Sequence, residues 1–313
     1  VSPLKIVLVS GLGPLLFSLA LIFLDEALFM DLAKTSKTLN QPNQSVREIQ
    51  WEIAEKNLIG LRRLNDRDVE AIKIIEFSDQ QKMPVPARAV DGVSAIISTI
   101  TAISGSDPVL DLHANDLAGF SGWVGYISAT SVYPDKPNGV CYEDTPPDPA
   151  TARGKARLVA EQRWQKLLNA EVFRAAGIYG PGRSPFDSLR DGTARIIERK
   201  GQVFNRIHRD DICRIILAAQ ARPRSGRIIN LADQKPAPQG DVVRHAAALL
   251  GVDPPAPQRL EDANLSSMAR SFYVSRRHVG SRVIKPELDV DLLYPDYESG
   301  LAAILQAEAS QTS

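Results

Sequence analysis

The stretch YISATSVYPD, residues 126–135, begins within a short apolar run at residues 123–129 and continues past its end. This run is one of several that have the composition of β-strands. These runs cover residues 5–9, 27–32, 71–77, 93–99, 123–129 and 170–176. Helix-like segments separate them, and the clearest covers residues 150–168, behind the proline-rich DTPPDP. Buried strands that alternate with helices are typical of a parallel sheet with helices on both faces. The sequence therefore predicts a Rossmann-type, doubly wound α/β fold.

The chain has 313 residues, enough for one large domain with a smaller annex. We expect the Rossmann-type domain over residues 1–222 and a C-terminal part, with a smaller lobe, over residues 223–313. Residues 39–68 exceed what one strand-helix unit needs, which predicts an added helix pair or an ordered insertion.

Charge and cysteine content restrict the class of partner. The chain has 37 Lys and Arg against 37 Asp and Glu, so no overall basic field favours nucleic acid or an anionic membrane. Cys141 and Cys213 form no disulfide framework, and the four histidines lack the spacing of a metal site. We expect a soluble protein of a reducing compartment, either the cytoplasm or an organellar matrix or stroma, without a structural metal.

The most apolar stretch runs from Pro14 to Met30 and must be tested as a membrane segment. Its uninterrupted part, Leu15 to Leu24, has about half of the roughly 20 residues that cross a bilayer. Asp25 and Glu26 then end it, and no basic leader precedes it. We therefore expect a buried helix and no membrane span.

A glycine-containing turn follows the first predicted strand in VSGLGPLL. Gly11 permits a tight turn, and Gly13 allows the backbone to approach a pyrophosphate at a helix N-terminus. The third glycine of the G-x-G-x-x-G pattern is replaced by Leu16, which compromises close packing of helix on strand. The turn predicts a dinucleotide site, with a turn that binds nothing as the alternative.

The end of the second predicted strand should contact the adenosine ribose of such a dinucleotide. Asp31 favours a free 2′-hydroxyl, as in NAD, whereas Lys34 and Lys37 could accept the 2′-phosphate of NADP. The choice between NAD and NADP stays open, and a solvated strand end is the alternative.

Four segments carry a resemblance to a known family: YISATSVY, DTPPDPATARGKARLVAEQ, FRAAGIYGPGR and RIHRDDI. In this order and at these spacings the chain resembles the extended short-chain dehydrogenase/reductases, and most of all their NAD-dependent epimerase/dehydratase-like branch. The resemblance covers residues 90–300, whereas residues 1–80 match only in topology. It implies the smaller C-terminal substrate lobe and binding of NAD or NADP.

Active members of this family use a Ser or Thr, a Tyr and a Lys four residues later. In this chain the resemblance places Ala129, Arg153 and Arg157 at those positions. Arginine stays protonated near pH 7 and cannot replace the tyrosine as acid and base, although it binds anions. Thr130, Tyr142 and Lys155 are the nearest substitutes. Alternatively, the two arginines are exposed cations at positions i and i+4 of an amphipathic helix.

The resemblance implies further binding positions. Asp79, Ser98 and Thr99 occupy the places where the family contacts adenine and its ribose, and Tyr179 and Gly180 border the nicotinamide. Implied substrate residues are Arg183, His208 and Arg270, the last beside Arg276, Arg277 and Lys285. His208 with Asp210 and Asp211 also suits a structural role at a helix N-terminus, and the cations suit a solvated surface.

Two functions remain. In the first, the chain is a catalytically silent or weakly active relative that keeps the fold and serves as an assembly or regulatory subunit. In the second, it is an active NAD(P)-dependent oxidoreductase or nucleotide-sugar epimerase/dehydratase-like enzyme with an unorthodox proton donor. The vacant triad favours the first. We expect a dinucleotide ligand and either a protein partner or a homodimer, as in the family.

Overall fold

The computed structural model describes residues 4–11, 49–51, 69–77, 94–102, 105–273 and 276–311, the first three ranges by their backbone. The predicted strand at 27–32 and the predicted helix at 14–30 lie outside these ranges. Within them, no helix combines the length and the apolar character that a membrane span requires.

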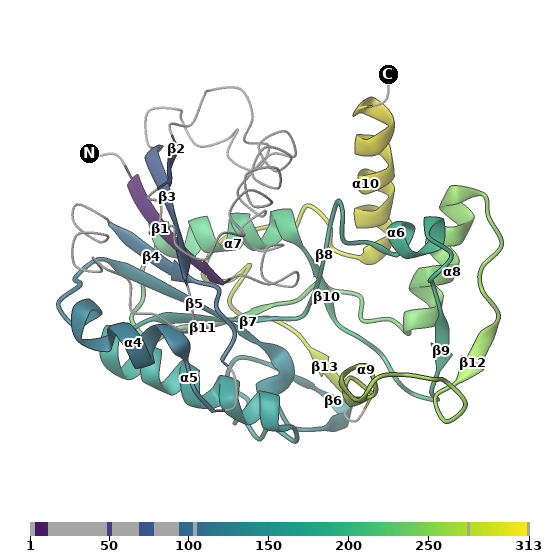
Figure 1. Ribbon diagram of the computed structural model, residues 1–313, viewed down its shortest axis with the longest axis horizontal. Helices are drawn as coiled ribbons and strands as arrows, with labels where there is room; N and C mark the ends of the chain where they lie inside the picture. Colours follow the sequence, from purple (N-terminus) through teal and green to yellow (C-terminus); the bar gives the residue numbers. More distant parts are fainter. Residues whose placement is uncertain are drawn as a thin grey trace, which may run out of the picture. The chain divides into compact units, whose positions relative to one another are not determined.

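Within the described ranges, seven strands form one sheet, which confirms the predicted fold class (Figure 1). Its order is β11-β7-β5-β4-β1-β3-β2. The strands are β1 (Leu4–Gly11), β2 (Ile49–Trp51), β3 (Val69–Phe77), β4 (Ala95–Ser98), β5 (Trp123–Ala129), β7 (Glu171–Ala175) and β11 (Ile228–Leu231). β1 pairs in parallel with both β3 and β4, and β4 pairs in parallel with β5. Because β3 and β4 lie on opposite sides of β1, the order of the sheet reverses there.

The strand β2 lies within the predicted insertion and pairs antiparallel with β3, Gln50 opposite Lys73. A strand at this place was not predicted, because three residues are too short for a periodic pattern. The remainder of residues 39–68 lies outside the described ranges.

The other elements are α4 (Pro108–Leu117), η2 (Thr130–Val132), β6 (Lys136–Cys141), α5 (Ala152–Leu168), β8 (Gly177–Tyr179), α6 (Pro185–Arg190), β9 (Ile196–Glu198), β10 (Arg206–His208), α7 (Arg209–Ala221), α8 (Gln239–Leu250), β12 (Pro257–Arg259), α9 (Ser267–Ser271), β13 (Arg277–Val279) and α10 (Tyr297–Gln311). Three parallel strand pairs complete the pairing: β8 with β10, β9 with β12, and β6 with β13.

The chain forms two compact units that interleave along the sequence. Unit 1 comprises residues 1–128, 156–173 and 216–228, and unit 2 comprises residues 129–155, 174–215 and 229–313. The sequence analysis placed a single boundary after residue 222. Residues 129–155 and 174–215 group with the C-terminal part, although they precede that boundary in the sequence.

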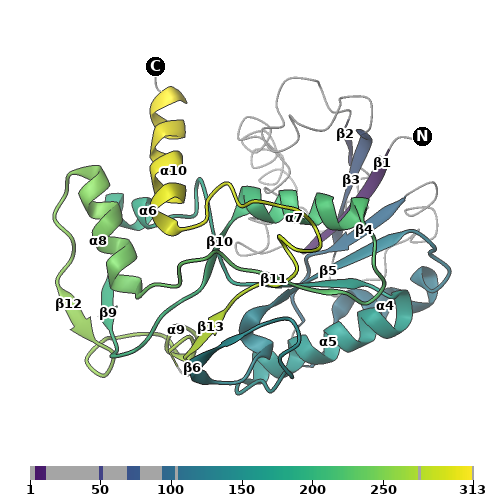
Figure 2. The ribbon, with the colours of Figure 1, turned by 180° about the vertical axis from the view of Figure 1, so that it is seen from behind.

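The core of unit 1 lies where α4 and α5 run side by side (Figure 2). Trp164 is fully buried and stacks on Tyr126 of β5, with ring centroids 5.6 Å apart. Its Nε1 donates to a carboxylate oxygen of Asp107, at 2.9 Å, and the other oxygen accepts from the backbone N–H of Leu110. Asp107 therefore caps α4 and anchors α5 at the same time.

A second buried polar group of unit 1 centres on Glu171, at the start of β7. Its carboxylate accepts from Nε and Nη2 of Arg227, at 2.9 and 2.7 Å. The other oxygen accepts from Nε1 of Trp123 and from the backbone N–H of Arg224. Both charged side chains are nearly inaccessible, so this is a buried ion pair whose carboxylate is fully hydrogen-bonded.

Unit 2 holds its C-terminal segment through an apolar cluster and a carboxylate. Tyr297, Leu301 and Ile304 of α10 pack with Phe186 of α6 and with the buried face of α8. Asp211, which is fully buried, accepts from the backbone N–H groups of Leu293 and Tyr294, at 2.7 and 3.0 Å. The loop that precedes α10 is thereby fixed to the first turn of α7.

Candidate functional site

In unit 1, the candidate cofactor residues lie at the carboxyl ends of the central strands. Gly11 is the last residue of β1, and Ser98 is the last residue of β4. In the pairing of these two strands, Ser98 lies opposite Val9 of β1. This is the place where the strand order reverses, and ligands of doubly wound sheets bind there. Ser98 and Thr99 are buried. The hydroxyls of Ser98 and of Ser128 in β5 find no hydrogen-bond partner among the described residues.

Arg157 reaches this region from α5. Its Nη1 donates to the carbonyl of Ile127, at 2.8 Å, and its Nη2 donates to the hydroxyl of Thr101, at 2.9 Å. It is not the freely solvated helix cation of the alternative interpretation. Its guanidinium is bound at the carboxyl end of β5, in the unit that contains Ser98 and Ser128.

In unit 2, the loop after β5 contains the position of the missing hydroxyl. Ala129 ends the strand, and the three-residue helix η2 follows directly. The carbonyl of Thr130 accepts from Nη1 of Arg277, at 2.9 Å. The hydroxyl of Ser131 is buried and has no hydrogen-bond partner in the described part of the chain. The sequence analysis passed over Ser131, because only the folded loop shows that its hydroxyl is enclosed.

Arg153 lies in the first turn of α5, where the family has its tyrosine. Its guanidinium carbon lies 4.5 Å from the ring centroid of Phe272, which is 52% exposed. Next to it, a Cβ added to Gly154 would lie 2.4 Å from the carbonyl oxygen of Ser131. Only glycine permits this approach of α5 to the loop.

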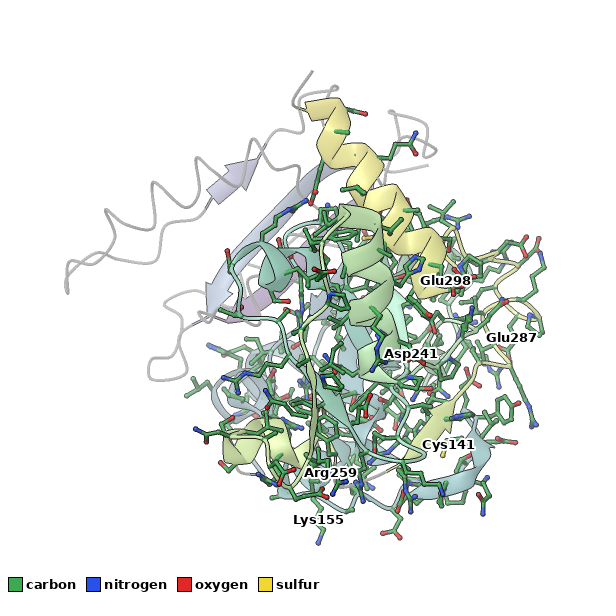
Figure 3. All side chains as sticks on the ribbon, turned by 90° about the vertical axis from the view of Figure 1, so that its right-hand side faces the viewer. Cys141, Lys155, Asp241, Arg259, Glu287 and Glu298 are labelled. Atoms are coloured by element: carbon green, nitrogen blue, oxygen red, sulfur yellow. The ribbon has the colours of Figure 1, made fainter. Side chains whose placement is uncertain are left out.

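The two other proposed substitutes differ in their surroundings. Tyr142 is half-buried, and the guanidinium carbon of Arg282 lies 3.8 Å from its ring centroid. Lys155 is exposed and points away from the ribbon (Figure 3). Tyr142 therefore has a cation beside it, whereas Lys155 contacts solvent.

Tyr179 and His208 form a packed aromatic group in unit 2. The ring of His208 lies edge-on to Tyr179, with centroids 5.1 Å apart, and 4.1 Å from the ring of Tyr294. Its Nδ1 accepts from the backbone N–H of Asp210, and burial lowers the pKa of His208 to about 3. This arrangement favours the structural role for His208, and its substrate role stays a prediction.

The glycine turn after β8 carries Gly180 and Arg183, which pair through their backbones at 3.2 and 3.0 Å. A Cβ on Gly180 would lie 2.8 Å from the Arg209 side chain, so this glycine makes room for Arg209. Arg183 is half-buried, and burial lowers its pKa. Among the described residues none forms an ion pair with its guanidinium, and its role toward a substrate stays a prediction.

Asp233 is a buried carboxylate in the same unit, and its pKa predicts a pH dependence. Burial raises that pKa to about 7. Between pH 4 and 7 the folded chain keeps a proton on Asp233 that the unfolded chain releases, so the contribution of Asp233 to stability falls as pH rises through 7 and levels off about one unit above it. In urea unfolding, the free energy of unfolding of the wild type relative to that of Asp233→Asn should fall by about 1 kcal/mol per pH unit from pH 5 to 7. The comparison is needed because the lowered pKa of His208 gives the wild type and the variant the same opposite slope below pH 6.5. An equal slope in wild type and variant would contradict this assignment.

Arg270 is exposed and donates to the carbonyls of Leu260 and Ala263, at 3.2 and 3.0 Å. It thereby holds the turn after β12, and its role toward a substrate stays a prediction. The predicted residues Gly13, Asp31, Lys34 and Asp79 lie outside the described ranges.

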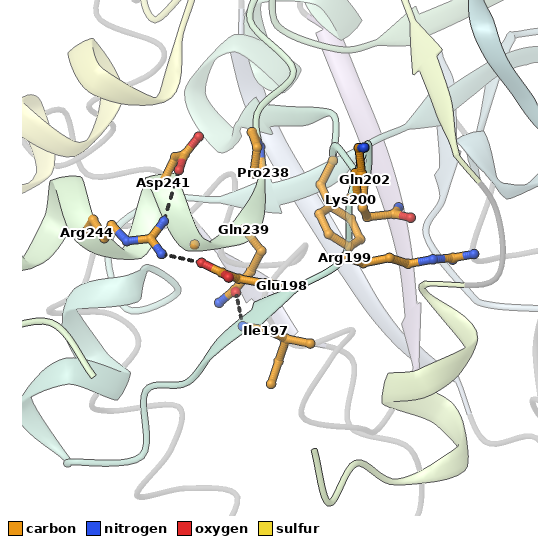
Figure 4. A pocket seen from close by; sticks show the side chains of 11 residues that line it. Ile197, Glu198, Arg199, Lys200, Gln202, Pro238, Gln239, Asp241 and Arg244 are labelled. Carbon is orange, nitrogen blue, oxygen red and sulfur yellow. Dashed lines mark hydrogen bonds and ion pairs between the residues drawn. The ribbon is translucent and has the colours of Figure 1, made fainter. Parts of the chain in front are cut away.

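A cavity of about 360 Å³ lies in unit 2 between β9 with its following turn and the start of α8 (Figure 4). Arg244 donates to Glu198 at 2.6 Å and to Asp241 at 3.1 Å and so neutralises much of the acidic wall. Arg199 and Lys200 also line the cavity, and no described carboxylate forms an ion pair with either. The sequence analysis missed this cavity, because it joins segments about 40 residues apart.

Comparison with known proteins identifies the fold first. No protein-family model matches the chain. The structure of DesIV, a dTDP-glucose 4,6-dehydratase from Streptomyces venezuelae with NAD and TYD bound, is similar over 98% of this chain and 97% of that one. The TM-score is 0.65 at 16% identity, so the likeness concerns the fold. The chain thus has the fold of this NAD-bound dehydratase, which confirms the fold that the resemblance implied.

Closer relatives follow. A functionally unknown conserved protein from Silicibacter pomeroyi is 42% identical, with a TM-score of 0.69 over 75% of this chain and 83% of that one. This chain belongs to the same family as that protein. Protein YeeZ of Escherichia coli strain K12 is 28% identical over 173 residues, which are 55% of this chain. The match covers 58% of YeeZ, somewhat over half its length.

Proposed function

We propose that this chain is a dinucleotide-binding protein that lacks the proton relay of its fold relatives and serves as a regulatory or assembly subunit. The observation that carries the proposal is the position of Arg157, bound to Ile127 and Thr101 at the carboxyl end of β5. A guanidinium fixed there can bind the ribose or phosphate oxygens of a dinucleotide. It cannot exchange a proton near pH 7.

The described residues of unit 1 fit such a ligand. Ser98 and Ser128 have buried hydroxyls that find no partner in the described part, and buried polar groups of this kind are rare unless something completes them. Together with Arg157 they would hold the ribose and the nicotinamide side of NAD or NADP. DesIV holds NAD in the same fold, which supports NAD as the first ligand to test. When bound, NAD supplies a hydride acceptor.

What the chain's own residues would do near a substrate is restricted. Ala129 offers no hydroxyl, and Arg153 is held against Phe272 as a permanent cation. Neither can deprotonate or protonate a substrate oxygen. Without such a group, a bound dinucleotide would be retained rather than turned over, which is the behaviour expected of a regulatory subunit.

A second function is favoured by the surroundings of Tyr142. Tyr142 is a half-buried phenol, which can donate a proton, and the guanidinium carbon of Arg282 lies 3.8 Å from its ring centroid. If the chain is an active NAD(P)-dependent oxidoreductase or epimerase/dehydratase-like enzyme, Tyr142 is the proton donor. Turnover of any sugar nucleotide, abolished by Tyr142→Phe, would establish this function in place of the first.

The first experiment is a calorimetric titration of the full chain with NAD⁺, NADH, NADP⁺ and NADPH. We expect micromolar binding of at least one dinucleotide. Arg157→Ala should weaken it tenfold or more, a loss of about 1.4 kcal/mol, because a charge-assisted contact is removed. Arg163→Ala is the matched control, since Arg163 lies on the same helix and pairs with the exposed Asp111. Absence of binding, or equal weakening in both variants, would refute the proposal.

A further inference from the structure

A buried carboxyl group lies in the loop that follows β11. Asp233 is 3% exposed. Its Oδ1 accepts from the backbone N–H of Lys235, at 3.3 Å, and its Oδ2 is buried without a hydrogen-bond partner among the described residues. Removing an ionised carboxylate from water without such partners is costly, whereas a protonated carboxyl is neutral and can donate. The geometry therefore favours the protonated form of Asp233 in the folded chain.

The loop that carries this carboxyl group is attached to the start of α10. The backbone N–H of Gln234 donates to the carbonyl of Pro295, at 2.9 Å. The Nζ of Lys235 forms an exposed ion pair with Glu298, at 2.5 Å, and lies 5.6 Å from the ring centroid of Tyr297. A backbone hydrogen bond and the contacts of a lysine therefore join this loop to the C-terminal helix.

Charged and titratable groups act on Asp233 from three elements: Tyr179 from β8, Arg206 from β10 and Asp296 from the loop before α10. The carboxylate of Asp296 accepts from the backbone N–H of Ser299, at 2.7 Å, which lowers its pKa and keeps it ionised. Its negative charge opposes a second one on Asp233. The hydroxyl of Tyr179 donates to the carbonyl of Asp296, at 3.2 Å, so β8 is joined to the same segment.

The guanidinium of Arg206 offsets only part of the cost of charging Asp233. It donates to the carbonyls of Phe204 and Ala237, at 2.9 and 3.1 Å, and burial lowers its own pKa. Burial raises the pKa of Asp233 to about 7, although the charge of Arg206 acts in the opposite direction. Asp233 therefore changes its charge close to neutral pH.

We propose that residues 233–235 and 295–298 form a latch that a proton on Asp233 keeps closed and that opens locally when Asp233 ionises. Ionisation leaves a negative charge buried near the carboxylate of Asp296 and short of hydrogen-bond donors. Opening the latch brings both carboxylates into contact with water, which removes this cost. The latch is therefore closed below neutral pH and opens more often above it.

The opening is confined to the first turn of α10. Leu301 and Ile304, farther along the helix, pack with Phe186 of α6 in an apolar cluster, and their side chains do not titrate. The helix thus stays attached to unit 2 while its first turn loosens. The latch requires no dinucleotide, so it is independent of the proposed function.

Hydrogen exchange of the full chain, followed by mass spectrometry at pH 6 and pH 8, tests the latch. Each exchange rate is divided by the intrinsic rate at that pH, which gives the fraction of open latch at the amides of Gln234 and Lys235. Opening returns Asp233 from a pKa of about 7 to its ordinary 3.8, so we expect about tenfold more opening at pH 8 than at pH 6. Amides of α8 should be more strongly protected at both pH values.

Three variants separate the carboxyl group from its surroundings. Asp233→Asn should remove the pH dependence of opening, because an amide does not ionise. Asp241→Asn is the matched control, since it neutralises an exposed carboxylate on α8 and should leave the tenfold ratio unchanged. Glu298→Gln removes the exposed ion pair with Lys235, so it should raise opening at both pH values and leave their ratio unchanged.

Three results would overturn the proposal. The first is a ratio below about twofold in the wild type, and the second is the same ratio in wild type and Asp233→Asn. The third is equal protection of the latch amides and of α8 at pH 8, which would show that unit 2 opens only as a whole. The first and third are measured on the wild type, so they decide the matter even if a variant fails to fold.

Discussion

Trp164→Ala should lower the free energy of unfolding by about 3–5 kcal/mol, the range for removing a large buried aromatic side chain. Trp164 is fully buried and packs within the same apolar cluster as Tyr126. Removing its indole therefore leaves a cavity in the core of unit 1. The substitution also takes a donor from the buried carboxylate of Asp107. An unsatisfied buried group adds to the cost of the cavity.

Denaturant unfolding followed by circular dichroism measures this loss. Trp164→Phe removes the donor but keeps most of the packed aromatic volume, so it should cost less than the alanine variant. Val159→Ala, on the same helix but 43% exposed, should change stability by less than about 1 kcal/mol. If the alanine variants at 159 and 164 unfolded at the same denaturant concentration, α5 would not anchor unit 1 as described.

Glu171→Ala should cost a comparable amount, about 3–5 kcal/mol, because breaking one partner of a buried ion pair leaves the other charge uncompensated. Arg227 would then be buried with only the carbonyls of Ala219 and Arg222 as acceptors among its described bonds. Trp123 and the backbone N–H of Arg224 would lose their acceptor as well. Four hydrogen bonds thus depend on a single carboxylate.

The same unfolding measurement tests this prediction, with Glu308→Ala as the control. Glu308 pairs with Arg190 at the surface, and exposed pairs contribute at most about 1 kcal/mol. The double variant Glu171→Ala, Arg227→Ala should recover part of the loss, since it removes the stranded charge. A double variant no more stable than Glu171→Ala would show that packing, rather than charge, dominates here.

Elements with a long local pattern could be predicted from the sequence. The strand predicted at 123–129 has those bounds, and the helix predicted at 150–168 begins at Ala152 and ends at Leu168. The strand is rich in aromatic and β-branched residues, and the helix is long and rich in Ala, Arg, Lys, Leu, Glu and Gln, which favour helix formation. The five strands β8, β9, β10, β12 and β13 have three residues each, too few for any periodicity, so the pairing in unit 2 had to come from the structure.

The candidate site likewise has features that the sequence predicts and features that only the structure shows. The vacancy at Ala129 and the arginines at 153 and 157 are properties of residue identity, which a resemblance shows directly. The binding of Arg157 to Thr101 joins residues 56 positions apart, and the approach of Gly154 to Ser131 depends on how α5 meets a loop. Such facts depend on three-dimensional packing. The raised pKa of Asp233 is a further example, because burial causes it.

The interleaving of the two units limits how this protein can be divided. The chain passes from one unit to the other five times, after residues 128, 155, 173, 215 and 228. Each passage falls inside a helix or a strand: β5, α5, β7, α7 and β11. A fragment that stops at residue 222 would lack Arg227 and the edge strand β11, and would leave Glu171 buried without its counter-ion. A single recombination point therefore cannot exchange either unit, and a single proteolytic cut cannot release one. We expect the two units to evolve as one gene segment.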